Sequence, residues 1–249
     1  MLSENTKRII GKTREYFKES NAKGLVFGLS GGLDSATAAY LLKEAVGKEN
    51  ITALLMPDTK ITSKESLDDS IQVAEALGIN YYIVTLDKSI DSFKELPWKQ
   101  NAVAEANLKA RLRMLLLYNY ANSNNCFVAG TSNRTECLLG YFTKYGDGAA
   151  DFLLLAGVLK TELKQVAEEL GVPKHIISKK PSAELWQGQT DEEELGIDYE
   201  TADLIIKEHI DKEITKEELI EKGISEKNIE LVVNRIENNK HKNNMPEVF

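Results

Sequence analysis

The residues whose types and spacing most clearly allow chemistry lie between Gly28 and Ser35, where the chain reads Gly-Leu-Ser-Gly-Gly-Leu-Asp-Ser. Two adjacent glycines let successive main-chain N–H groups converge on an anion. A helix that starts near Ser35 would point its unpaired N–H groups and the positive end of its dipole at the same place. Because the hydroxyls of Ser30 and Ser35 would add further donors, the segment predicts a phosphate-binding loop.

The type of phosphate loop is restricted by Asp34. A Walker A loop has lysine at this position, and the glycine spacing also fails the dinucleotide fingerprint G-x-G-x-x-G. A carboxylate that faces a triphosphate repels it unless a divalent cation lies between them, so Asp34 indicates Mg²⁺, which prefers carboxylate and phosphate oxygens. The alternative is a tight strand-to-helix turn in which Asp34 only caps the helix.

A second polar block reads Gly-Thr-Ser-Asn-Arg-Thr-Glu at 130–136 and Gly-Tyr-Phe-Thr-Lys-Tyr-Gly-Asp-Gly-Ala-Ala-Asp at 140–151. It follows an apolar run that reads as a strand, and ligands of open α/β sheets bind beyond the carboxyl ends of strands. The block combines cations, carboxylates and glycines, and long loops inside domains are usually functional. The alternative is a solvated surface loop with scattered charges.

The elements that must position these residues alternate along the chain. Short apolar runs predict strands at 25–29, 51–56, 81–86 and 127–130. Helical spacing predicts helices at 35–46, from a Ser63 cap to 77, at 103–122 and at 159–170, with a loop at 131–151. Residues Leu108, Leu112, Leu115 and Leu116 are expected on one buried stripe of the long helix. Continuous apolar strands alternating with helices predict an α/β fold, a doubly wound open parallel sheet with helices on both faces.

The remainder of the chain predicts loops and short charged helices, with capping boxes at Thr190…Glu193 and Thr215…Glu218. No linker rich in Pro, Gly or Ser divides the sequence. We therefore expect a single domain over 1–249, with a helical C-terminal extension at about 212–249.

Composition excludes several classes of protein. The net charge of −8 argues against nucleic acid as a partner. No apolar run approaches the roughly 20 residues of a membrane helix, and the N-terminus lacks a signal-peptide pattern, so we expect a cytoplasmic protein without membrane contact. The two cysteines, Cys126 and Cys137, form neither a disulfide framework nor a zinc signature. We expect Cys126 in a strand of the core and no catalytic role for Cys137.

The segment Ser30–Ser35 resembles the SGGxDS loop of the N-type ATP pyrophosphatases. This resemblance implies an adenine nucleotide alpha hydrolase-like fold and a reaction in which a substrate is adenylated and pyrophosphate leaves. The acceptor stays open at this point, because GMP synthetases, asparagine and argininosuccinate synthetases, tRNA thiolases and NAD synthetases share the loop.

Further strings resemble the NAD synthetases in particular. They are GTxNxxE from Gly130, GYFTKYGDGxAD from Gly140, Lys160-Thr161-Glu162-Leu163, the 180–183 run Lys-Pro-Ser-Ala, and the 188–192 run Gly-Gln-Thr-Asp-Glu. The resemblance covers nearly the whole chain and is weakest beyond about Asp211; Leu154 stands where many members have proline. It implies adenylation of deamido-NAD by ATP, displacement of AMP by ammonia, a Mg²⁺ cofactor and a homodimer with deamido-NAD near the subunit interface.

The resemblance also implies roles for individual residues. ATP would be bound by Gly28, Leu29, Ser30, Gly31, Gly32, Leu33, Asp34, Ser35, Thr131, Lys160 and Ser182. Mg²⁺ would be held by Asp34 and Glu136. The leaving pyrophosphate would be neutralised by Lys160, and ammonium would be bound or deprotonated by Asp147. Deamido-NAD would be contacted by Arg111, Lys144, Asp151, His241 and Lys242, the last two as a C-terminal clamp over the substrate.

Several alternatives remain at the level of the sequence. Arg111 on the polar face of a helix and His241 in a tail would ordinarily be solvent-exposed. Another adenylating enzyme, such as a GMP synthetase-like amidase or a tRNA thiolase, uses the same loop, and a nucleotide sensor without catalysis could be built on the same fold. Because a glutamine amidase domain does not fit into 249 residues, we expect free ammonia as the nitrogen source.

Overall fold

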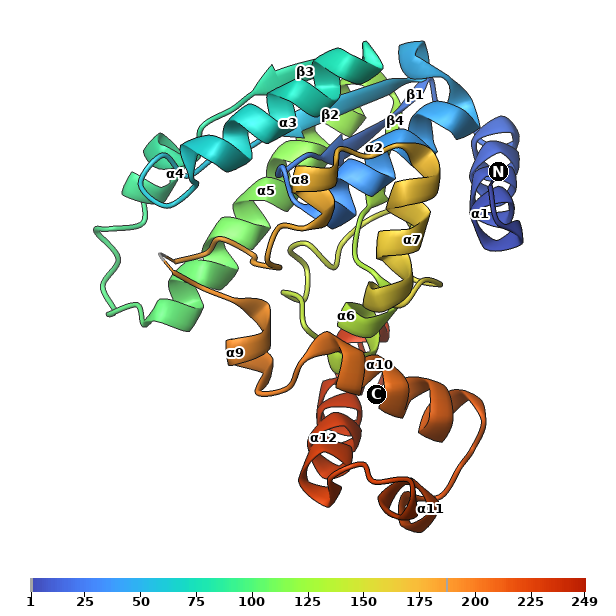
Figure 1. The fold of residues 1–249 in the computed structure, drawn as a ribbon. Coiled ribbons are helices and arrows are strands. Elements are labelled where there is room, and N and C mark those ends of the chain that lie inside the picture. Colours follow the sequence, from blue (N-terminus) through green and yellow to red (C-terminus); the bar gives the residue numbers. More distant parts are fainter. Residues whose placement is uncertain (1, 187) are drawn as a thin grey trace.

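The computed structural model describes residues 2–186 and 188–249, and its centre is a five-stranded parallel sheet (Figure 1). The strands follow the order β3-β2-β1-β4-β5, and their bounds are β1 (Gly24–Gly28), β2 (Ile51–Leu55), β3 (Asn80–Ile83), β4 (Cys126–Gly130) and β5 (Phe152–Leu153). Every neighbouring pair is parallel. The chain runs from β1 outward to β3 and then returns to β4 beside β1, so the predicted doubly wound sheet is confirmed.

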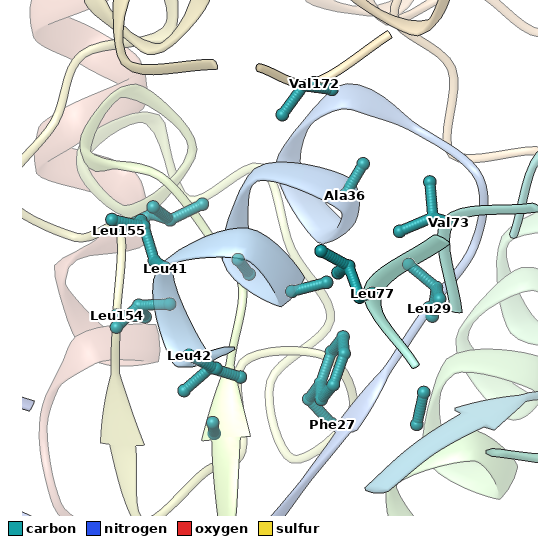
Figure 2. Packing of buried hydrophobic residues seen from close by; sticks show 14 of the residues in the cluster. Phe27, Leu29, Ala36, Leu41, Leu42, Val73, Leu77, Leu154, Leu155 and Val172 are labelled. Atoms are coloured by element: carbon teal, nitrogen blue, oxygen red, sulfur yellow. The ribbon is translucent and has the colours of Figure 1, made fainter. Parts of the chain in front are cut away.

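Helices cover both faces of this sheet because the strands are apolar on both faces. The first face carries α1 (Glu4–Glu19), α2 (Leu33–Val46), α3 (Lys64–Leu77) and α7 (Lys160–Leu170). Leu25 and Phe27 of β1 point to these helices, and Figure 2 shows Phe27 close to Leu77 of α3. Val26 points the other way and packs in the cluster that contains Leu112 of α5 (Ala102–Asn124).

The helices α9 to α12 lie at one end of the molecule, whereas α4 and α8 lie closer to the sheet (Figure 1). Short elements are η1 (Lys48–Asn50), α4 (Asp87–Asp91), α6 (Arg134–Leu139), α8 (Lys174–Ile177) and α9 (Asp191–Leu195). The C-terminal part contains α10 (Tyr199–Ile205), the π-helical η2 (Ile206–Asp211), α11 (Lys216–Glu221) and α12 (Glu226–Asn243). A separate apolar cluster joins Leu139 of α6 to Ile205, Leu219 and Val232 of this part. The single domain expected over 1–249, with its C-terminal extension from about 212, remains a prediction.

Three expectations about elements are corrected by the structure. The 131–151 segment is not a continuous loop, because α6 forms inside it behind a capping box of Asn133 and Glu136. The capping box expected at Thr190 is wrong, since no side chain caps α9, whereas the one at Thr215 is confirmed. Neither α1 nor the short strand β5 was expected. Among the described residues, no helix is long and apolar enough to span a membrane.

Leu115 corrects the stripe expected on the long helix. Leu112 is buried, but Leu115 is 59% exposed. The row Leu108–Leu112–Leu116 repeats every four residues and packs in the cluster beside the sheet. Leu115 instead follows Arg111 by four residues and shares its outward face, so the surface of α5 carries a leucine next to a cation.

Candidate functional site

A cavity of about 550 Å³ opens at the carboxyl ends of β1, β2 and β4, beside the point where the strand order reverses. Open α/β sheets bind ligands at this topological position, and the volume is within the range of small-molecule sites. The wall is formed by the β1–α2 loop, α5, the 130–149 segment, the 179–194 segment and α12. Residues that are far apart in the sequence therefore line one cavity.

The phosphate loop has the bend that its two glycines predict. β1 ends at Gly28 and α2 starts at Leu33, with Gly32 as N-cap and no side chain capping the helix. Gly31 has a φ of +79°, and a Cβ there would lie 2.1 Å from the main-chain oxygen of Ser66. Only glycine fits this position. The hydroxyl of Ser35 accepts a hydrogen bond from the N–H of Ser30, 3.1 Å away, and thereby fixes the bend.

Two carboxylates and one ammonium form the polar centre beside this loop. The Nζ of Lys160 contacts Asp34 Oδ2 and lies 3.3 Å from Glu136 Oε1. Asn133 donates its side-chain N–H to Asp34 Oδ1 at 2.7 Å. Asp34 is therefore not the helix cap of the alternative interpretation. It lies in the first turn of α2 and is largely buried, with 19% of its side chain exposed.

Negative charge exceeds positive charge at this centre. Burial and the adjacent Asp34 raise the pKa of Glu136 to about 8, although Lys160 opposes the shift. Burial lowers the pKa of Lys160, but the two carboxylates more than offset this and raise it overall. Asp191 adds a further buried carboxylate to the same wall. An additional cation would relieve this imbalance.

The donor set fits Mg²⁺. Asp34 and Glu136 both reach the single Nζ of Lys160, so their oxygens converge on one place. Mg²⁺ usually takes one or two carboxylates together with phosphate oxygens and water. No group of three or more His, Cys, Asp or Glu side chains suited to a metal occurs among the described residues. The pair is therefore suited to a metal that arrives with a nucleotide and not to a closed protein cage.

Asp147 lines the same cavity. Its Oδ1 accepts a hydrogen bond from the N–H of Thr143 at 2.9 Å, and the hydroxyl of Thr143 donates to Asn107 of α5 at 2.7 Å. The carboxylate is open to the cavity, yet the surrounding protein removes enough water to raise its pKa, while the Thr143 N–H and the charge of Arg113 act in the opposite direction. A carboxylate with a raised pKa is a better proton acceptor.

Most residues that the sequence singled out lie together in the cavity wall. They are Gly28, Leu29, Ser30, Gly32, Leu33, Asp34, Ser35, Thr131, Glu136, Asp147, Lys160, Ser182 and Lys242. Gly31 supports the loop from behind, against Ser66. Four of the residues expected to contact deamido-NAD lie outside the wall, namely Arg111, Lys144, Asp151 and His241.

Three of these four outer residues, Arg111, Lys144 and His241, are joined by hydrogen bonds. Arg111 on α5 donates from Nε and Nη2 to the main-chain oxygen of Lys144, at 3.3 and 3.2 Å. The ammonium of Lys144 donates to the main-chain oxygen of His241 at 2.5 Å. Asp151 accepts a hydrogen bond from the N–H of Val128 at 2.6 Å, at the edge of the sheet. The structure thus joins Lys144 and His241 to Arg111 on the exposed face of α5, and places Asp151 beside β4.

Two groups of wall residues were missed by the sequence analysis. Asn107 and Arg113 face the cavity from α5, and Arg113 donates to the main-chain oxygen of Met56 at 3.2 Å. Their signal was present in the sequence, because both are polar residues on a helical row that also contains Ala106 and Ala110. A helical wheel places Arg111 and Arg113 on different faces of α5, so it would have shown that only one of these two arginines can face the cavity.

The second missed group surrounds Asp191. Both carboxylate oxygens of Asp191 accept hydrogen bonds from tyrosine hydroxyls, from Tyr141 at 3.1 Å and from Tyr199 at 3.0 Å. The ring of Tyr199 lies 5.3 Å from Nζ of Lys160. Nothing in the local sequence indicates that these distant tyrosines meet, because the contact depends on the packing of α9 and α10.

The cysteines offer no nucleophile. Burial raises the pKa of the Cys137 thiol to about 12, and neighbouring Glu136 adds to the shift. Burial also raises the pKa of Cys126, at the start of β4. A thiolate is the reactive form of cysteine, so both thiols are unreactive at neutral pH.

Comparisons with known proteins agree on one family. A family model described as NAD synthase matches residues 5–246. The NH(3)-dependent NAD(+) synthetase of Archaeoglobus fulgidus is 47% identical, over 97% of this chain and 94% of the relative. The structure of NMN synthetase from Francisella tularensis superimposes with a TM-score of 0.87 at 33% identity, over 100% and 99% of the two chains. That of NH3-dependent NAD synthetase from Campylobacter jejuni gives 0.83 at 33% identity, over 98% and 97%. The chain belongs to the NAD synthase family.

Proposed function

We propose that this chain is an ammonia-dependent NAD synthetase, a ligase that converts deamido-NAD, ATP and ammonia into NAD, AMP and pyrophosphate. Family membership supports this function, as does the name of the Archaeoglobus fulgidus relative, which the chain matches over 94% of that relative's length. The single observation that carries the proposal is the convergence of Asp34, Glu136 and buried Lys160 beside a glycine loop at the carboxyl end of β1.

The first half of the reaction activates a carboxylate. A carboxylate is a poor acyl donor because oxide would have to leave, whereas transfer of AMP gives a mixed anhydride with a stabilised phosphate as leaving group. A carboxylate oxygen of the nicotinate forms the new bond to the α-phosphorus, and the bond to the pyrophosphate oxygen breaks. Catalysis then consists of positioning and charge neutralisation. The N–H groups of the 28–35 loop and the ammonium of Lys160 hold the departing pyrophosphate.

Asp34 and Glu136 would hold Mg²⁺, which when bound supplies Lewis-acid neutralisation of the phosphate oxygens. The two carboxylates also orient Lys160, because its ammonium contacts both of them. Thr131 and Ser182 present hydroxyls to the same cavity and are proposed to contact ATP.

The second half of the reaction forms the amide. Ammonia attacks the acyl carbon, the bond to the AMP oxygen breaks, and the attacking nitrogen must lose a proton. Asp147 is proposed to bind ammonium and accept this proton, because its carboxylate faces the cavity with a raised pKa. The hydrogen bond from Thr143 fixes its position.

The surface beyond the cavity supports two further parts of the proposal. A cavity of about 550 Å³ has the size of a site for one small ligand, so the dinucleotide is proposed to extend over Arg111, Lys144 and Asp151. The homodimer that the resemblance implies is proposed to cover this face of α5, with Leu115, which is 59% exposed beside Arg111, in its interface. Lys242 belongs to the cavity wall, and His241 adjoins Lys144. The cytoplasmic location remains a prediction.

The close likeness to a structure named NMN synthetase makes the mononucleotide a second candidate substrate. A direct assay separates the candidates: the purified chain is incubated with ATP, Mg²⁺ and either deamido-NAD or nicotinate mononucleotide, with ammonium or ammonia-free glutamine. We expect NAD and pyrophosphate with deamido-NAD and ammonium, much slower turnover of the mononucleotide, and no amidation with glutamine. Faster amidation of the mononucleotide than of deamido-NAD would show that the mononucleotide is the substrate. Amidation with glutamine would refute the proposal that free ammonia is the nitrogen source.

The same assay tests the other members of the larger group. A tRNA thiolase needs reactive cysteines, and burial raises the pKa of both thiols here. A nucleotide sensor would bind ATP but release no pyrophosphate when deamido-NAD is added. Pyrophosphate release that depends on deamido-NAD excludes both alternatives.

A further inference from the structure

The C-terminal end of α12, from Asn239 to Asn243, donates four hydrogen bonds to main-chain oxygens around the end of α6. Asn239 donates its side-chain N–H to the oxygen of Leu139 at 3.2 Å. Lys242 donates to the oxygens of Gly140 at 2.6 Å and Phe142 at 3.0 Å. Asn243 donates to the oxygen of Cys137 at 2.8 Å. Because the last carbonyl groups of a helix have no partner inside it, these side chains cap α6 from another element.

Gly140 shows that the approach of the two helices is tight. Its φ is +63°, and a Cβ at this position would lie 2.2 Å from Cβ of Asn239. Any larger residue would therefore push α12 away from α6. Arg235, Asn239 and Lys242 follow each other at spacings of four and three residues, and all three line the cavity. One side of α12 thus serves both as a wall of the cavity and as the support of the turn after α6.

The element that α12 supports carries part of the polar centre. Glu136 lies three residues before Leu139 in the same short helix and contacts Lys160 at 3.3 Å. A helix of six residues has only one and a half turns, so it has little stability of its own. A displacement of its carboxyl end therefore moves Glu136 relative to Lys160 and Asp34.

We propose that Asn239 is a positioning residue, which fixes α6 from the C-terminal helix and thereby sets the position of the Glu136 carboxylate at the reaction centre. This inference rests on the proposed function and extends it, because the described hydrogen bonds of Asn239 go to Leu139 and to Arg235 of its own helix and none of them reaches the 28–35 loop. The side-chain N–H of Asn239 holds α6 in place, because an oxygen at the same position would repel the carbonyl oxygen of Leu139.

The test compares Asn239→Asp with Asn238→Asp. Both substitutions have the same shape and charge change on the same helix, but Asn238 is exposed. We expect Asn239→Asp to lower kcat by about 10- to 100-fold, the size expected when a reacting geometry is misplaced. The KM for ATP should stay within about twofold of the wild type, because the phosphate loop is untouched. Pyrophosphate exchange without ammonia should fall in parallel with kcat, and Asn238→Asp should behave as the wild type.

Gly140→Ala tests the same contact from the side of α6 and leaves the sequence of α12 intact, which keeps the inference testable if Asn239→Asp does not fold. The same loss of kcat with unchanged KM for ATP is expected. An Asn239→Asp or Gly140→Ala variant with kcat within twofold of Asn238→Asp overturns the inference. A wild-type chain that forms no NAD from deamido-NAD instead overturns the proposed function, so the two failures are distinguishable.

Discussion

Lys160 illustrates how burial gives a single residue its chemical role. Its side chain is 6% exposed, and its ammonium is retained because Asp34 and Glu136 accompany it. A buried charge without partners would cost several kcal/mol, so the three residues stabilise one another. The sequence singled out all three, with Asp34 and Glu136 as the carboxylates for Mg²⁺ and Lys160 as the partner of the pyrophosphate. Their shared ion-pair network required the packing of α2, α6 and α7, which no local pattern reports.

At this scale we predict the effect of Asp34→Asn. The amide keeps the shape but removes one of the two carboxylates proposed to hold Mg²⁺, so turnover should fall on the order of 10²–10⁴-fold. The variant should still fold, because Glu136 remains to pair with Lys160. Steady-state kinetics measure the loss of turnover, and thermal melting shows whether the variant folds. Asp68→Asn, which changes an exposed carboxylate on α3, is the matched control. Near-normal turnover of Asp34→Asn would remove the carboxylate from the mechanism.

At the scale of elements, the sequence was most reliable where one strand or helix depends on its own residues. The strands β1, β2 and β4 and the helices α2, α3, α5 and α7 were located to within a few residues, because apolar period, caps and glycines define them locally. The predictions were wrong or incomplete where contacts between distant segments determine the local structure. α6 is too short to show a period, β5 has two residues, and α9 begins without the side-chain cap that Thr190 predicted.

The β1–α2 connection gives a prediction about an element. Gly31→Ala places a Cβ 2.1 Å from the main-chain oxygen of Ser66 at a φ of +79°, so the phosphate loop must shift. We expect the KM for ATP to rise at least tenfold, because the loop N–H groups no longer converge. Gly11→Ala is the matched control, since a Cβ there meets nothing within 4 Å and alanine stabilises a helix by about 0.5–1 kcal/mol. Equal ATP kinetics in the two variants would contradict the role of the loop.

The contact between α1 and α7 gives a prediction about pH. The carboxylate of Glu169 accepts hydrogen bonds from the Ser3 N–H at 3.0 Å and the Thr6 hydroxyl at 2.7 Å, which lower its pKa to about 2. A lowered folded-state pKa gives stability that is complete above the ordinary value of 4.5 and is lost as the pH falls through about 2. Glu169→Gln should therefore unfold at lower urea concentration than the wild type at pH 6, and the difference should shrink below pH 4.5. A difference independent of pH between 6 and 3, or an equal effect of Glu168→Gln at the exposed neighbour, would contradict this account.

At the scale of the whole molecule, the proposed reaction uses two surfaces. The cavity holds the phosphate loop and the polar centre, whereas the exposed face of α5 carries Arg111 and Leu115. The sequence predicted the loop, the polar centre and Arg111 as one site, and placed Leu115 on the buried stripe of α5. The helical period divides the residues of α5 into faces, but which face points into the cavity depends on how the helix packs across the sheet. The contact of the C-terminal part with the site is also visible only in the folded molecule, where α12 donates hydrogen bonds to the end of α6.

The proposed homodimer is tested at this scale by Leu115→Asp. A charge in the proposed interface should convert dimers into monomers and lower kcat/KM for deamido-NAD by more than tenfold, since leucine burial at an interface is worth about 1.5–3 kcal/mol. Sedimentation and kinetics measure the two effects. Leu204→Asp, at a leucine of α10 that is 46% exposed, should change neither. A wild-type monomer, or a dimeric Leu115→Asp with normal kinetics, would contradict the proposed interface.

The central claim is that the nicotinate carboxylate is activated by direct attack on the α-phosphorus of ATP, with pyrophosphate leaving into the 28–35 loop and Lys160. The most direct measurement follows ¹⁸O from deamido-NAD labelled at both carboxylate oxygens during turnover with ATP and ammonium. Mass spectrometry should find one labelled oxygen in AMP, one retained in the amide of NAD, and none in pyrophosphate. Label in pyrophosphate, or AMP without label, would show that no acyl-adenylate forms and would contradict the account.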